Sequence, residues 1–157
     1  MAEKYYIAYG SNLNVAQMRI RCPGAKILGT AELNGWELLF KGSKTGSYLT
    51  IERSEFGKVP VAVWSVRDTD EAALDRYEGY PAFYYKKAMK LRCKSRRTGI
   101  YRTVSAFVYI MHEKHPVGIP SPHYVQVCLE GYRDFGFDEN VLLDAFDKSV
   151  EVCKNEG

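Results

Sequence analysis

The sequence predicts an α+β fold formed by one domain over residues 1–157. Many short strand-like segments occur with few helices long enough to cross between parallel strands, which argues against a doubly wound parallel sheet. Two helical patterns come at the end of the chain, after the strands. No internal repeat or long low-complexity linker divides the 157 residues, a length that suits a single domain.

The chain opens with an apolar run that suits a buried strand and ends at Gly10-Ser11-Asn12. Glycine permits positive φ, and Ser and Asn favour turns and helix caps. Successive backbone N–H groups at such a turn can converge on an anion, helped by the positive end of the following helix. The alternative is a plain strand–turn–helix junction. A short helix with apolar positions is then expected before Pro23-Gly24 stops it. Those positions are Val15, Met18, Ile20 and Cys22.

Two strands, Ile27–Leu33 and Trp36–Phe40, are predicted around a tight turn at Asn34-Gly35. Residues 41–47 form the most flexible-looking loop, which is either a lid or the end of a long hairpin. Further strands are expected at Tyr48–Glu52 and Lys58–Val66.

Asp68 and Glu71 form a plausible capping box for a helix that runs through Tyr77. Lys86–Cys93 and Ile100–Met111 are predicted to be two long strands joined by a basic turn.

Ser121-Pro122 is an N-cap and N1 pair that opens a helix ending near Gly136. Asp138 starts the last helix, whose apolar positions fall on one face. These positions are Leu142, Ala145, Phe146 and Val150.

Composition and charge exclude several classes of protein. Hydrophobic residues make up 46% and charged residues 26% of the chain, which is typical of globular proteins. The net charge of +3 is too small to imply nucleic-acid binding by itself. The N-terminus has no signal-peptide core and no apolar run approaches a membrane span, so we expect a cytoplasmic protein that binds no membrane.

Neither cysteines nor histidines predict a metal site. Four cysteines occur without C-x-x-C spacing and are expected to be small buried hydrophobes or surface thiols. His112 and His115 lie in a loop with no third ligand at a useful spacing, and His123 falls in the first turn of a helix.

One basic cluster lies on the predicted strand 86–93 and the turn after it. Lys90, Arg92 and Lys94 alternate with apolar residues, as on a strand with one solvated face. We interpret the cluster as a charged edge that resists sheet-to-sheet pairing. Binding of single-stranded RNA is the alternative, but no RNP-type signature accompanies the cluster. The remaining basic residues are Lys86, Lys87, Arg96 and Arg97.

Three separated motifs occur in order along the chain. They are Tyr6-Ile7-Ala8-Tyr9-Gly10-Ser11-Asn12-Leu13, Leu74-Asp75-Arg76-Tyr77-Glu78-Gly79-Tyr80-Pro81, and Pro120-Ser121-Pro122-His123-Tyr124 followed by Cys128-Leu129-Glu130-Gly131. Together with a weaker match at residues 61–66, this ordered set resembles the γ-glutamylcyclotransferase-like (AIG2-like) family. The resemblance extends from about Tyr5 to Phe137.

The resemblance implies a small, mostly antiparallel, barrel-like sheet flanked by a few helices. It also implies a lyase that needs no cofactor or metal and releases 5-oxoproline and a free amine or amino acid from a small γ-glutamyl amide. Glu78 occupies the family's catalytic position. The substrate-binding positions that the resemblance implies are Tyr6, Ile7, Ala8, Tyr9, Gly10, Ser11, Asn12, Leu13, Tyr84, Tyr109 and Tyr124.

The residues around Glu78 suit a general base. It falls at the C-terminal end of a short helix and among several aromatic residues, so the helix dipole and the apolar setting should both raise its pKa. A carboxylate whose pKa has been raised is a better base near neutral pH than an exposed carboxylate with an ordinary pKa.

Alternatives remain open. Tyr80-Pro81 after Glu78 departs from the dipeptide-specific pattern, so the substrate could be a γ-glutamylamine or another γ-glutamylated metabolite. A non-catalytic binding module of the same fold is the alternative from another class. Whether the protein forms a homodimer is also left open.

Overall fold

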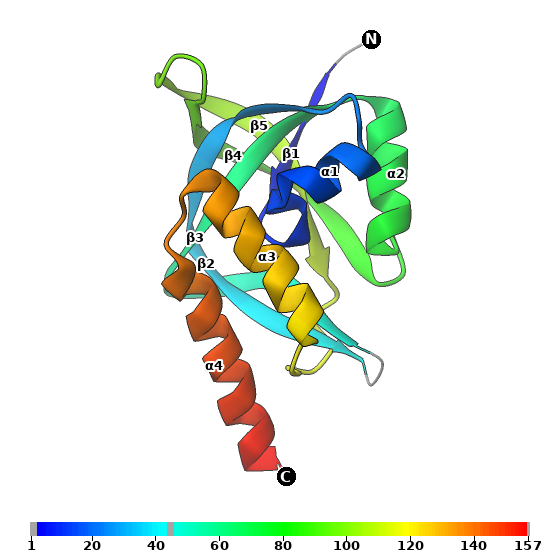
Figure 1. Cartoon of the computed structure of the whole chain (residues 1–157), viewed down its shortest axis with the longest axis vertical. Helices are drawn as coiled ribbons and strands as arrows, with labels where there is room; N and C mark the ends of the chain where they lie inside the picture. Colours follow the sequence, from blue (N-terminus) through cyan, green and yellow to red (C-terminus); the bar gives the residue numbers. More distant parts are fainter. Residues whose placement is uncertain (1–2, 44–45, 157) are drawn as a thin grey trace.

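The computed structural model describes residues 3–43 and 46–156, and a closed five-stranded barrel forms its centre (Figure 1). The strands follow one another around the barrel in the order β1-β3-β2-β4-β5. Neighbouring strands are antiparallel, except that β1 pairs in parallel with β5 at Tyr6 and Phe107. The α+β class is confirmed, as is the barrel that the family resemblance implied. The strands are β1 Lys4–Ala8, β2 Lys26–Ser43, β3 Gly46–Val66, β4 Tyr84–Ser95 and β5 Tyr101–Met111.

The long hairpin of β2 and β3 corrects the prediction of a turn at Asn34-Gly35. Both halves of β2 pair with the same partner, because Asn34 lies opposite Lys58 and Trp36 opposite Arg53. Gly35 therefore lies within one strand at a register shift, opposite residues 54–57 of β3, and its φ of 85° explains the glycine. The segments predicted as separate strands on either side of residues 53–57 likewise belong to the single strand β3.

The predicted loop 41–47 is mainly the end of this hairpin. Lys41 pairs with Tyr48, Gly42 with Ser47, and Ser43 with Gly46. Residues 44 and 45 lie outside the described residues, so the prediction of a lid is not settled for them.

The described residues form four α-helices, which flank the barrel (Figure 1). α1 and α2 lie next to each other on one flank, whereas α3 crosses the front and α4 extends beyond the barrel toward the C-terminus. A 3₁₀ turn, η1, links β1 to α1 and packs against α3. No helix within the described residues has the length and apolarity that crossing a membrane requires. The bounds are η1 Ser11–Leu13, α1 Val15–Arg21, α2 Asp68–Glu78, α3 Pro122–Phe135 and α4 Glu139–Glu156.

The ends of α3 agree with the sequence, but the cap of α2 does not. Ser121 Oγ accepts a hydrogen bond from the backbone N–H of Tyr124, and Gly136 ends α3 with a φ of 68°. At α2, however, the backbone N–H of Arg67 donates to Asp70 Oδ2 at 3.0 Å. Asp70 therefore makes the contact predicted for Glu71.

Two of the apolar positions named on the expected helices are exposed to solvent. Ile20 of α1 is 83% exposed, while Met18 of the same helix is fully buried. In α4, Val150 is 39% exposed, whereas the neighbouring Ser149 is buried. Leu142 and Ala145 are buried as predicted.

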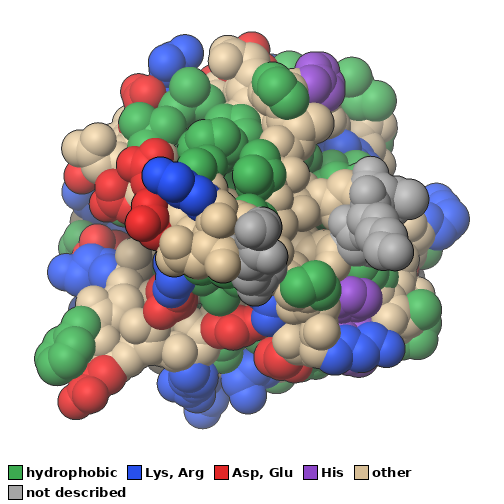
Figure 2. Space-filling model, turned by 90° about the horizontal axis from the view of Figure 1, so that it is seen from below, with side chains coloured by type: hydrophobic (Ala, Val, Ile, Leu, Met, Phe, Trp, Pro, Cys, Tyr) green, Lys and Arg blue, Asp and Glu red, His purple; other side chains and the backbone are tan. Residues whose placement is uncertain are grey.

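The outer side of β4 has the predicted alternation. Lys90, Arg92 and Lys94 are exposed, and the intervening Leu91 and Cys93 are buried. β2 pairs with β4 only at Gly29–Ser95 and Thr30–Lys94, in agreement with a charged edge along the rest of the strand. Figure 2 shows acidic, basic and apolar side chains interspersed on another face of the molecule. Binding of RNA stays an untested alternative.

Candidate active site

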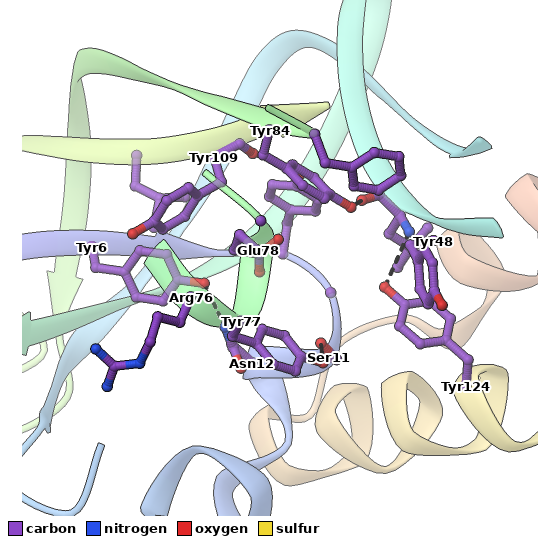
Figure 3. Close-up of a pocket in the computed structure, with 16 residues that line it drawn as sticks. Tyr6, Ser11, Asn12, Tyr48, Arg76, Tyr77, Glu78, Tyr84, Tyr109 and Tyr124 are labelled. Carbon is purple, nitrogen blue, oxygen red and sulfur yellow. Dashed lines mark hydrogen bonds between the residues drawn. The ribbon is translucent and has the colours of Figure 1, made fainter. Parts of the chain in front are cut away.

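A pocket of about 340 Å³ opens where β1, η1, the end of α2 and the starts of β4 and α3 meet (Figure 3). Its volume lies at the lower end of the range for small-molecule sites, about 300–1,000 Å³. Half of the residues that line it are aromatic. The lining residues are Tyr6, Ile7, Tyr9, Gly10, Ser11, Asn12, Tyr48, Leu49, Arg76, Tyr77, Glu78, Gly79, Phe83, Tyr84, Tyr109 and Tyr124.

Glu78 is the last residue of α2, and its side chain lies in the middle of the pocket (Figure 3). Gly79 ends the helix in the left-handed region at a φ of 64°, which turns the chain away and leaves the Glu78 side chain facing the pocket. Burial raises the pKa of Glu78 to about 8, and the positive charge of Arg21 opposes the rise. No hydrogen bond to the carboxylate contributes within the described residues. An acidic group without a fixed partner is thus available to a ligand.

The loop Gly10–Leu13 forms another wall. Leu13 N–H donates to Gly10 O at 3.0 Å, which closes the turn. Ser11 Oγ and Tyr77 OH share a hydrogen bond of 2.8 Å, and Asn12 Nδ2 donates to Tyr6 OH at 2.8 Å. The side chains of Ser11 and Asn12 are therefore occupied. The backbone N–H groups of residues 10–12 have no acceptor among the described residues, so they could bind an anion.

Arg21 fixes this loop from outside the pocket. Its guanidinium donates to Asn12 Oδ1 and to Gln17 Oε1, and it lies 3.5 Å from the centroid of the Tyr77 ring. Through these contacts Arg21, which is part of α1, links the loop Gly10–Leu13 to the end of α2.

Most pocket tyrosines already have hydrogen-bond partners. Tyr9 OH donates to Tyr109 O at 2.7 Å, and Tyr84 OH donates to Leu49 O at 2.8 Å. Tyr124 OH accepts from the Leu49 N–H at 3.0 Å. Burial raises the pKa values of Tyr9, Tyr84 and Tyr124 well above the usual range, so these tyrosines remain neutral phenols.

A chain of charged groups anchors α2 to β4 and β5. Tyr109 OH donates to Asp75 Oδ1 at 2.5 Å, and Lys86 Nζ lies 2.8 Å from the same oxygen. Lys86 Nζ also contacts Glu71 Oε2 at 2.6 Å, which corrects its assignment to a solvated basic face. Asp75 is three residues before Glu78 on α2, so these contacts hold the last turn of the helix in place.

The structure brings most of the expected site residues together. Glu78 and nine of the expected substrate-binding residues line the pocket, whereas Ala8 and Leu13 point into the core and do not line it. The nine are Tyr6, Ile7, Tyr9, Gly10, Ser11, Asn12, Tyr84, Tyr109 and Tyr124. Tyr77 and Gly79 were missed although they flank Glu78, and their position beside it was a usable signal. Arg76 was also missed although it lies in the same motif, and Phe83 was expected only as one of the aromatic residues around Glu78. Nothing in the sequence pointed to Tyr48 or Leu49.

No three histidine, cysteine or acidic side chains converge on a metal-binding geometry in residues 3–43 and 46–156. His112 Nε2 lies 2.8 Å from Pro81 O, which gives this ring a structural contact. The four cysteines are free thiols.

A sequence model described as "Gamma-glutamyl cyclotransferase, AIG2-like" matches residues 6–126, about three quarters of the chain. The chain belongs to the γ-glutamyl cyclotransferase, AIG2-like family. The γ-glutamylcyclotransferase of Bos taurus is 27% identical over 147 residues, which cover 83% of this chain and 71% of the relative. That of Homo sapiens is 28% identical over 138 residues, with 83% and 71% coverage.

Solved structures share the fold of this AIG2-like chain. A structure titled "Gamma-glutamyl cyclotransferase" superimposes with a TM-score of 0.75 at 22% identity, covering 92% of this chain and 86% of the other. An uncharacterized protein from Homo sapiens gives a TM-score of 0.75 at 24% identity, with 92% and 87% coverage. At these identities the likeness concerns the fold alone.

Gly131 explains one family motif physically and supports a prediction about stability. A Cβ at Gly131 of α3 would lie 2.7 Å from Asn14 N and Leu13 Cβ, so η1 can approach α3 only where a side chain is absent. We expect Gly131→Ala to destabilise the protein by about 1–3 kcal/mol in chemical denaturation, because the helix and the loop must move apart. Gly24→Ala is the matched control, since no atom lies within 4 Å of the added methyl group. Equal stability of the two variants would contradict this reading of the contact.

Arg21 supports a prediction about Glu78. Replacing Arg21 by Met removes the one cation that lowers the pKa of Glu78, so the pKa should rise further above about 8. The titration midpoint, followed by carboxyl-carbon NMR, should move up by about one pH unit or less. Arg19→Met, an exposed arginine on the same helix, should leave the midpoint in place. A midpoint that is unchanged in Arg21→Met would show that the guanidinium does not act on Glu78.

Proposed function

We propose that the protein converts a small γ-glutamyl amide into 5-oxoproline and a free amine. One observation carries the proposal: in a chain of this family, Glu78 with its raised pKa faces a loop of free backbone N–H groups across a small pocket. Both features suit a substrate that carries an ammonium group and a carboxylate close together.

In the proposed reaction, the α-nitrogen of the substrate forms a bond to its own γ-carbonyl carbon. The bond from that carbon to the leaving nitrogen then breaks, and a five-membered lactam remains. Over the cycle two protons pass from the α-ammonium to the leaving nitrogen, so atoms and charge balance without a redox step. Because nucleophile and electrophile share one molecule, holding them in a near-attack geometry is worth an effective molarity of about 10⁵–10⁸ M.

Glu78 is the group that we assign to proton transfer. With a pKa of about 8 it is mostly protonated in the empty pocket at pH 7. An incoming α-ammonium group favours the carboxylate through its positive charge, so substrate binding produces the base that the first step requires. After ring closure the same carboxyl group can donate the proton to the leaving nitrogen.

The loop Gly10–Asn12 is assigned to anion binding. Its free N–H groups could hold the α-carboxylate of the substrate or the oxyanion that develops on the γ-carbonyl oxygen. Tyr109, whose hydroxyl donates to Asp75, is a further hydrogen-bond acceptor at the pocket wall. Four free thiols agree with a reducing compartment such as the cytoplasm, which is the location that we propose.

The direct test is to incubate the pure protein with γ-glutamyl dipeptides, γ-glutamyl-ε-lysine and glutathione, and to measure 5-oxoproline. We expect release from at least one γ-glutamyl compound. Absence of product from all of them at high enzyme concentration would remove this proposal. In that case, thermal stabilisation by 5-oxoproline would indicate a pocket that binds without turnover.

A further inference from the structure

We propose that the preferred substrate carries an aromatic ring on its leaving amine and no carboxylate there, and that this ring binds in an aromatic subsite of the pocket. The inference rests on the proposed function, since it concerns the leaving group of the same reaction. The aromatic subsite is lined by Tyr48, Leu49, Phe83, Tyr84 and Tyr124.

The rings of the aromatic subsite already make the edge-on contacts that a further ring would join. The Tyr48 ring lies edge-on to Phe83 and Tyr124, with centroid distances of 6.3 and 5.2 Å. The Phe83 and Tyr84 rings are 5.2 Å apart in the same type of arrangement. Aromatic pairs at such separations stabilise one another beyond their buried area.

Most polar atoms of this subsite already form hydrogen bonds with other atoms of the protein. Tyr84 OH and Tyr124 OH bind the carbonyl oxygen and the N–H group of Leu49, respectively. These tyrosines therefore offer ring carbons to a ligand, and the backbone of Leu49 offers no free group. A polar leaving group would have to give up its bonds to water with little replacement here.

Charge is confined to other parts of the pocket. Among the described lining residues only Arg76 and Glu78 are charged, and Figure 3 shows Arg76 directed away from the end formed by Tyr48 and Tyr124. His115 packs on Phe83 with ring centroids 4.7 Å apart, and burial lowers its pKa, which disfavours a positive charge on this ring. A carboxylate on the leaving group thus meets no cation of the described residues, and an unpaired charge against apolar walls is costly.

The aromatic subsite adjoins the loop that we assign to anion binding. A Cβ at Gly10 would lie 3.4 Å from Leu49 Cβ and 3.5 Å from Tyr124 OH. A γ-glutamyl group held at the loop and at Glu78 can therefore direct its leaving nitrogen toward the aromatic subsite. The pocket volume of about 340 Å³ leaves room for a small leaving group and not for a protein chain.

Four substrates separate the effect of the ring from the effect of the carboxylate. γ-Glutamyl-phenethylamide and γ-glutamyl-phenylalanine differ only in the carboxylate, as do γ-glutamyl-ethylamide and γ-glutamyl-alanine. The 5-oxoproline assay gives kcat/KM for each. We expect the phenethylamide to exceed the ethylamide and γ-glutamyl-phenylalanine each by about tenfold or more, the usual worth of a hydrophobic group that fits its pocket.

The outcomes distinguish this inference from the proposed function. If a substrate with a carboxylate on the leaving group is turned over as fast as its partner without one, or if the ring gives no advantage, the inference is wrong and the proposed function stands. If the four substrates yield no 5-oxoproline but glutathione or γ-glutamyl-ε-lysine does, the inference is wrong and the proposed function stands. If none of these six compounds yields 5-oxoproline, the proposed function and the inference fall together.

Variants then locate the ring. Tyr48 is 42% exposed, so Tyr48→Ala should fold, and it should lower the phenethylamide-to-ethylamide ratio of kcat/KM by about tenfold. Tyr101→Ala removes an exposed tyrosine from β5 outside the pocket and should leave that ratio unchanged. An unchanged ratio in Tyr48→Ala would place the ring elsewhere and overturn the assignment of the aromatic subsite.

Discussion

Replacement of Glu78 by Gln is expected to lower the turnover of a γ-glutamyl amide by roughly 10²–10⁴-fold, the usual worth of a positioned general base. Glutamine keeps the size of the side chain and its place at the end of α2, but it cannot accept the proton of the α-ammonium group. The measurement is the initial rate of 5-oxoproline release with a substrate that the unmodified protein turns over. Glu55→Gln, at an exposed position of β3, is the matched control and should keep full turnover.

The pH profile shows whether Glu78 acts as the base or only maintains the shape of the pocket. In the unmodified protein kcat/KM should rise with pH until about 8, because the carboxylate is needed, and fall once the substrate's ammonium group is lost. The remaining activity of Glu78→Gln should show only a rise through the pKa of the substrate amine. A bell-shaped profile that survives in the variant would mean that another group carries the proton.

The sequence predicted the fold correctly where the local residue pattern agrees with the way the segments pack and pair in the barrel. The ends of α3 follow from Ser121 and Gly136, and the alternation on β4 follows from one buried and one solvated face. At Asn34-Gly35 the local pattern suits both a tight turn and a register shift within one strand. Only the pairing of both flanks with β3 decides between them, and that partner begins more than ten residues later.

The site was predictable from motifs to a similar extent. Glu78 and the Gly10–Asn12 loop lie in motifs that carry the family resemblance, and the barrel brings them together. Tyr48 and Phe83 stand in segments with no motif, and they reach the pocket only through the β2–β3 hairpin and the turn before β4. Lys86 belongs to a basic run in the sequence, but α2 places two carboxylates against it.

The same Glu78→Gln variant is expected to be more stable than the unmodified protein at alkaline pH. Folding raises the pKa of Glu78 from 4.5 to about 8, so the folded state binds more protons than the unfolded state between these values. The free energy of unfolding therefore falls as pH rises through this window and levels off above about pH 8. The full shift corresponds to an upper bound of about 5 kcal/mol. Because the pocket opens to solvent, which screens the charge, we expect about half of it.

Chemical denaturation at pH 5 and pH 9 measures this effect. The difference in free energy of unfolding between Glu78→Gln and the unmodified protein should be small at pH 5 and reach about 2–3 kcal/mol at pH 9. Other carboxyl groups are common to both proteins, so their titration cancels in the difference. Glu151→Gln, on the exposed surface of α4, should stay within about 0.5 kcal/mol of the unmodified protein at both pH values. A difference that does not grow with pH would contradict the raised pKa, and with it the idea that the pocket keeps a destabilising acid for the sake of catalysis.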